Sequence, residues 1–132
     1  MAANDFNTWL DRAKSSLAIA KNNTNNEIFN EDLCFQAQQA VEKALKGLLI
    51  FHNVNPEKTH NLVLLIKELS KHMDISEEIN ETVILNDYAV LTRYPGYYTP
   101  IDDIEYKAAV EIAENCLKWI ENFTNLANGK TN

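Results

Sequence analysis

The segment from Arg93 to Tyr98 contains the side chains best suited to chemistry. It reads Arg-Tyr-Pro-Gly-Tyr-Tyr and places one of the chain's two arginines beside three tyrosines. A guanidinium can hold a phosphate through two hydrogen bonds, and a tyrosine can stack on a base or donate its hydroxyl to a phosphate oxygen. The proline and glycine predict an irregular loop, a kind of segment that often carries function. The candidate nucleotide- or partner-binding residues are therefore Arg93, Tyr94, Tyr97 and Tyr98.

Two lysines could add positive charge beside this loop. Lys43 and Lys46 lie three residues apart on an expected helix, so they share one face of it. The alternative is that both lysines only solvate an exposed helix surface. For the loop, the corresponding alternative is that Arg93 pairs with a helix carboxylate while the tyrosines cover the end of the fold. The residues alone leave both alternatives open.

No pattern in the sequence indicates a metal or a cofactor. The chain has no glycine-rich phosphate loop, no CxxC pair and no HExxH, and its three histidines lack the spacing of metal ligands on one helix. Cys34 and Cys116 both lie among apolar residues at helical spacing, so we expect reduced thiols that pack in the core. We predict neither a metal site nor a bound cofactor.

The charge balance restricts the possible partners. The formal net charge is −7 and the pI is about 4.9, so the field of the whole molecule repels nucleic acid. DNA is not an expected partner, and an RNA contact would need a local basic cluster. The first residues lack a basic start followed by an apolar run, and no apolar stretch approaches the ~20 residues that cross a bilayer. We expect a cytoplasmic protein without membrane contact.

The elements that position these residues are helices. The hydrophobic fraction is 45%, and three glycines and three prolines are too few for the turns of an all-β fold. Apolar residues at steps of three and four predict helices over about 6–20, 31–51, 61–70, 77–90 and 103–123. The second should be the central, most buried helix. In the fourth we expect Ile79, Val83 and Val90 to face inward, and in the last Ile104, Ala108, Ile112 and Cys116.

Each predicted helix has an apolar stripe along one face, and these stripes can be buried only by packing the helices together. The predicted fold is therefore all-α, an antiparallel up-and-down bundle of four to five helices. We expect a single domain over residues 1–127, followed by a frayed tail at 128–132.

Three motifs give the chain a resemblance to a known family. The stretch 34–50 contains Gln-Gln-Ala-Val-Glu-Lys-Ala-Leu-Lys and resembles the long second helix of HEPN domains. Thr59-His60-Asn61-Leu62 is similar to the Thr-His-Asp-Leu sequence that begins the third helix of that family. Leu91-Thr-Arg-Tyr-Pro95 is similar to its Arg-Tyr-Pro element. The resemblance covers nearly the whole chain and adds His60 to the candidate binding residues.

The resemblance implies a helical bundle that commonly forms a homodimer. Relatives of this kind are often encoded beside a minimal nucleotidyltransferase in prokaryotic toxin–antitoxin pairs. Some are metal-independent ribonucleases, in which four to six residues separate an arginine from a histidine at a cleft between two copies. Arg93 matches the arginine, but Tyr98, Thr99 and Pro100 occupy the positions of the histidine.

The missing histidine matters because cleavage of RNA through its 2′-hydroxyl needs groups that exchange protons near neutral pH. The expectation is therefore a non-catalytic protein that binds a nucleotide, RNA or a partner nucleotidyltransferase through a dimer cleft. Two alternatives stay open. One is a metal-independent ribonuclease that uses Arg93 with a tyrosine or a distant histidine, and the other is a purely structural assembly module.

Overall fold

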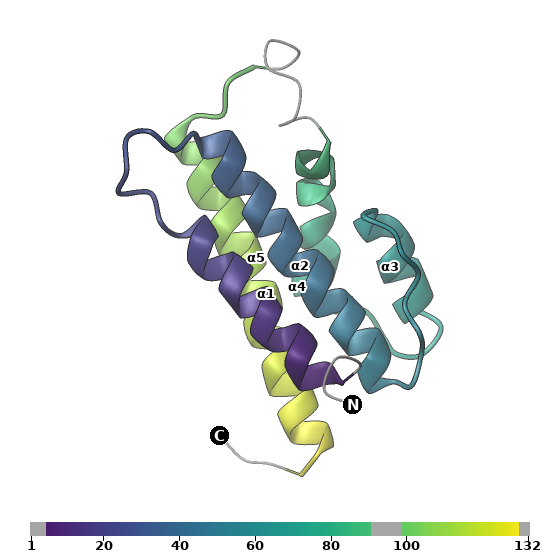
Figure 1. The fold of residues 1–132 in the computed structure, drawn as a ribbon. Helices are drawn as coiled ribbons and strands as arrows, with labels where there is room; N and C mark the ends of the chain where they lie inside the picture. The colour runs from purple at the N-terminus through teal and green to yellow at the C-terminus, as the bar shows by residue number, and fades with distance from the viewer. Residues whose placement is uncertain (1–4, 91–98, 130–132) are drawn as a thin grey trace.

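The computed structural model describes residues 5–90 and 99–129, and every regular element in these ranges is helical (Figure 1). The predicted all-α class is confirmed. No helix within these ranges is both long enough and apolar enough to cross a membrane. The elements in chain order are α1 (Phe6–Ala20), α2 (Asn30–Phe51), α3 (Leu62–Leu69), α4 (Glu77–Asn80), the 3₁₀ helix η2 (Glu81–Ala89) and α5 (Asp103–Ala127).

Short polar side chains begin four of the helices. Asp5 accepts a hydrogen bond from the Thr8 amide at the start of α1, and Asp102 accepts one from Glu105 at the start of α5, both at 2.8 Å. Asn61 and Ser76 do the same for α3 and α4. These bonds satisfy amide groups that have no partner within the helix. Hydrogen bonds to these capping side chains therefore set the starts of the four helices.

The central element is α2, which packs against α1, α3, η2 and α5. Every residue from Ala37 to Leu49 is buried except Gln39 and Lys43, which are half-buried. Gly47 lets α1 approach closely, because a Cβ atom at this position would lie 2.8 Å from the Cβ of Trp9. The prediction that this helix is the most buried one is confirmed.

The connection after α2 returns along the bundle, so α3 runs in the same direction as α2 (Figure 1). α2 ends at His52, and Asn53 takes a left-handed conformation with φ 63°. Further along this connection, the ring of His60 lies against Glu42 in the middle of α2. Beyond the other end of α3, His72 stacks on His52.

Two predicted apolar stripes are partly wrong. Val83 and Val90 are 42% and 56% exposed because this segment winds as a 3₁₀ helix with three residues per turn, which buries Thr82 and Leu85 instead. In α5, Ile104 is 81% exposed and Ala108 is also exposed.

The first turns of α5 bury Tyr106 and Ala109 in place of these two residues. The Tyr106 hydroxyl donates a 2.5 Å hydrogen bond to the carbonyl of Ala20, at the end of α1. The buried face of α5 is therefore set by a polar contact that apolar spacing does not reveal.

His52 is a half-buried imidazole directly after α2. Its Nε2 is buried without a hydrogen-bond partner among the described residues, and its ring packs against Phe51, Phe123 and His72. Burial, and then the neighbouring His72, lower the pKa of His52 from its ordinary value of 6.5. The folded protein therefore holds this ring neutral at a pH where the unfolded chain binds a proton.

We expect the free energy of unfolding to decrease as the pH falls below about 6.5, because His52 takes up its proton more readily in the unfolded chain. Above that pH, His52 does not make the free energy of unfolding depend on pH. Urea unfolding at pH 7.5, 6.5 and 5.5 measures the effect, and His52→Phe should flatten the curve over this window. The carboxyls of Glu68 and Glu114 have lowered pKa values, so their contributions are lost only below about pH 4.5. An equal slope in His52→Phe would contradict the assignment.

Candidate functional site

A stripe of three polar side chains runs along the buried part of α2. Gln38, Glu42 and Lys46 follow one another at every fourth position and are 0%, 4% and 8% exposed. Side chains four apart lie one above the other on a helix. Burial of a charged group is costly unless it is paired, so these residues must satisfy one another or meet partners from other elements.

Glu42 is the centre of this stripe. Its carboxylate accepts a 3.0 Å hydrogen bond from Nζ of Lys46 and lies 3.1 Å from Nδ1 of His60. The side-chain amides of Gln38 and Gln39 donate to the same carboxylate at 3.5 and 3.3 Å. An ammonium, an imidazole and two amides thus surround one buried acid.

His60 is held to α2 through its backbone as well as its ring. Gln38 Nε2 donates a 3.0 Å hydrogen bond to the carbonyl of His60, while Glu42 contacts the ring. The imidazole is nevertheless 70% exposed. His60 therefore joins the buried polar stripe to the protein surface.

A hollow of about 300 Å³ lies where His60 reaches the surface. Its shape is fixed by two asparagines, because Asn86 accepts a 2.8 Å hydrogen bond from the Leu62 amide and donates to Asn61 at 3.3 Å. These bonds join the end of η2 to the start of α3. The residues that line the hollow are Thr59, His60, Asn61, Asn86, Asp87, Ala89 and Val90.

The structure brings Lys46 and His60 together but places Lys43 elsewhere. Lys43 donates a 2.8 Å hydrogen bond to the hydroxyl of Ser16 on α1 and has no contact with the Glu42–His60 group among the described hydrogen bonds. Lys46 does not solvate an exposed face, since it is buried beside Glu42. The remaining predicted residues, Arg93, Tyr94, Tyr97 and Tyr98, lie outside the described ranges.

Sequence reasoning did not single out Glu42, Gln38 or Asp87. A signal for the first two was present, because polar residues at a step of four occur in the helix predicted to be most buried. For Asp87 no signal existed, since its place beside His60 depends on how the chain returns after α2.

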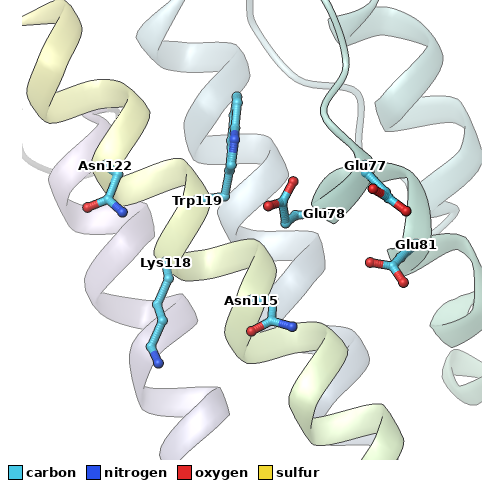
Figure 2. Close-up of a pocket in the computed structure, with 7 residues that line it drawn as sticks. All are labelled: Glu77, Glu78, Glu81, Asn115, Lys118, Trp119 and Asn122. Atoms are coloured by element: carbon cyan, nitrogen blue, oxygen red, sulfur yellow. The ribbon is translucent and has the colours of Figure 1, made fainter.

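A second hollow, of about 460 Å³, lies between α4–η2 and α5. Figure 2 shows Glu77, Glu78 and Glu81 on one side, across from Asn115 and Trp119 on α5. Glu77 and Glu78 lie in the first turn of α4 and Glu81 in the first turn of η2, where acidic side chains interact favourably with the helix dipole. The described residues contain no group of three or more histidines, cysteines or acids that could hold a metal ion. These observations do not indicate that this second hollow is a reaction centre.

The two thiols are packing groups in the described core. Cys34 and Cys116 are free and fully buried, and burial raises the pKa of each to about 12. A thiol is nucleophilic only as the thiolate, so neither one is an activated nucleophile. Their predicted role in packing is confirmed.

The sequence matches the HEPN domain over residues 6–123, which includes the polar stripe, His60 and the hollow. The chain belongs to the HEPN family. Its structure is similar to the crystal structure of TT1696 from Thermus thermophilus, with a TM-score of 0.78 and 28% sequence identity. The match covers 90% of this HEPN chain and 98% of the other. No match was found among curated proteins.

We expect the Glu42–Lys46 pair of this HEPN domain to behave as a buried ion pair. Glu42→Gln should lower the free energy of unfolding by about 3 kcal/mol, because it leaves the Lys46 ammonium buried without a carboxylate. Lys46→Met should also destabilise, and the double variant should lose less than the sum of the two single variants.

Chemical denaturation of the three variants measures this coupling. The matched control is Glu121→Gln, since Glu121 pairs with Lys14 at the surface, where both side chains are more than 40% exposed. That substitution should cost less than about 1 kcal/mol. Additive losses in the Glu42 and Lys46 variants would show that the two groups stabilise the fold independently.

Proposed function

We propose that this HEPN chain is a non-catalytic cytoplasmic protein that binds a nucleotide, a partner nucleotidyltransferase or both through a cleft between two copies. The observation that carries the proposal is the position of His60. It lies at a hollow whose described lining includes Val90, and Arg93 follows Val90 by three residues in the sequence. His60 is therefore part of the lining of the hollow, and Arg93 is three residues along the sequence from that lining.

The small number of residues between Val90 and Arg93 supports a shared site for His60 and Arg93. Three residues of fully extended backbone span about 10 Å at most. We therefore propose that Arg93 holds the phosphate of a ligand that occupies the hollow. The tyrosines of the same segment, Tyr94, Tyr97 and Tyr98, would stack on the base or donate hydrogen bonds.

The proposal of a non-catalytic role rests on the ribonuclease motif. Tyr98, Thr99 and Pro100 stand where active relatives have a histidine. A tyrosine, with a reference pKa near ~10, exchanges protons poorly at neutral pH. An arginine and several aromatic rings can bind a nucleotide without cleaving RNA. A nucleotidyltransferase partner in a toxin–antitoxin pair would use the same surface.

A dimer is supported by the distribution of exposed apolar side chains. Among the described residues, five of the nine large apolar side chains that are exposed lie on α3, on η2 or directly after η2: Val63, Leu64, Val83, Ile84 and Val90. The two elements are neighbours, and Val90 also lines the hollow. We propose that a second copy covers this face and closes the cleft.

One observation favours a second candidate function, a metal-independent ribonuclease. The carboxylate of Glu42 holds Nδ1 of His60 and leaves Nε2 for other partners. A carboxylate that orients an imidazole in this way is a common arrangement for a general base. In this alternative His60 would replace the missing histidine.

Arg93→Ala should weaken binding of ATP by about 10- to 100-fold, because a charge-assisted phosphate contact contributes roughly 1.5–3 kcal/mol. Titration calorimetry with the pure protein measures it. The matched control is Arg12→Ala, which removes the other arginine of the chain, an exposed residue on α1, and should leave the affinity unchanged.

The same variants separate the rival functions. Absence of heat with ATP, together with no capture of a nucleotidyltransferase, would overturn the binding proposal. Cleavage of cellular RNA by the wild-type protein that is lost in both Arg93→Ala and His60→Gln would establish the ribonuclease. If Arg93→Ala changes only thermal stability, the role of Arg93 is structural.

Ile84→Glu should convert a dimer into a monomer, because it places a charge in the proposed apolar interface. Light scattering at micromolar concentration should give twice the chain mass of 15.1 kDa for the wild type and one chain mass for the variant. Leu126→Glu changes a similarly exposed apolar residue near the end of α5 and should stay dimeric. A wild-type mass of one chain would exclude the dimer.

A further inference from the structure

The hollow beside His60 contains acceptors and no fixed cation among its described lining residues. Asp87 contributes a carboxylate, His60 contributes an imidazole, and the other polar groups are a threonine hydroxyl and two amides. Lys46 is not among these lining residues, and its ammonium is buried and paired with Glu42. The chemistry of this space therefore favours hydroxyl groups over phosphate.

The pairing with Glu42 determines which nitrogen of His60 is available. Both carboxylate oxygens of Glu42 lie within 3.2 Å of Nδ1, so the Nδ1–H of a neutral ring donates to Glu42. Nε2 then carries a lone pair. The described residues give no hydrogen bond to Nε2, and the ring is largely exposed. His60 thus offers an acceptor to a ligand in the hollow.

The asparagine oxygens in the hollow are already engaged within the protein. Oδ1 of Asn86 accepts from the Leu62 amide, and Oδ1 of Asn61 accepts from the Val63 amide and from Asn86. The Thr59 hydroxyl accepts from the Asn61 amide. The carboxylate of Asp87 has no side-chain partner among the described residues. Asp87 and Nε2 of His60 are therefore the side-chain acceptors in the hollow to which no described residue donates a hydrogen bond.

We propose that this hollow binds the ribose of a ribonucleotide, with Asp87 and Nε2 of His60 accepting hydrogen bonds from its hydroxyl groups. The proposal rests on the nucleotide-binding function and states which part of the nucleotide lies here. A volume of about 300 Å³ accommodates a sugar. A ribose presents neighbouring hydroxyl donors, and a carboxylate is a known type of partner for them. The 2′-hydroxyl is also the group that separates ribonucleotides from deoxyribonucleotides.

Titration calorimetry with each of the four ribonucleoside monophosphates and its 2′-deoxy counterpart tests this assignment. At least one ribonucleotide should bind about tenfold more tightly than its 2′-deoxy form, the ratio expected for one hydrogen bond to a charged acceptor. Asp87→Asn should bring this ratio close to one. The substitution lies at an exposed position, and thermal melting verifies that the variant folds.

The matched control is Asp11→Asn, which removes an exposed carboxylate of α1 and should leave the ratio unchanged. Equal affinity of ribo- and deoxyribonucleotides in the wild type would overturn the ribose assignment while leaving nucleotide binding in place. If Asp87→Asn weakens the binding of ribonucleotides and 2′-deoxyribonucleotides equally, the ribose assignment is overturned as well. No binding of any nucleotide would reject nucleotide binding itself, the part of the proposed function on which the ribose assignment rests, and this result is distinct from equal binding.

Discussion

The burial of α2 on all sides is the constraint on which the rest of the structure depends. A helix that packs against α1, α3, η2 and α5 has no exposed face on which to leave polar residues. Gln38, Glu42 and Lys46 must therefore be satisfied inside the fold, and a partner missing from this set would leave a buried charge at a cost of several kcal/mol. The stripe contributes little net stability compared with apolar residues, but it fixes the geometry of the groups that meet it.

One consequence is the position of His60. The chain leaves α2 at His52 and could begin the next helix at once, yet it returns along the bundle. Gln38 holds the backbone of His60 and Glu42 holds its ring, so the returning segment is fixed at two points. Asn61 then starts α3, and Asn86 joins it to η2. The hollow beside His60 follows from this sequence of hydrogen bonds and needs no flexible element to form.

Much of the fold could be predicted from the sequence, because apolar residues at steps of three and four mark the helices. The stripe of α1 and the central position of α2 are confirmed. The pattern failed for Val83, since a 3₁₀ helix shifts the buried face and periodicity alone does not separate it from an α-helix. Apolar spacing also did not indicate the Glu42–Lys46 pair, although polar residues at a step of four in the helix predicted to be most buried were a readable signal. The place of Asp87 beside His60 depends on long-range packing and could not be predicted.

The charge of the molecule limits what the hollow and the Arg93 segment could bind together. With a formal net charge of −7, every further phosphate of a long nucleic acid meets repulsion, whereas a mononucleotide brings few phosphates to a single arginine. Asp87 adds to this field where the ligand would lie, which disfavours phosphate in the hollow and favours hydroxyl groups. In the proposed complex, the cation that holds the phosphate would come from outside the hollow. A site that binds hydroxyl groups in the hollow and phosphate outside it suits a small ligand or a basic partner surface better than a polynucleotide.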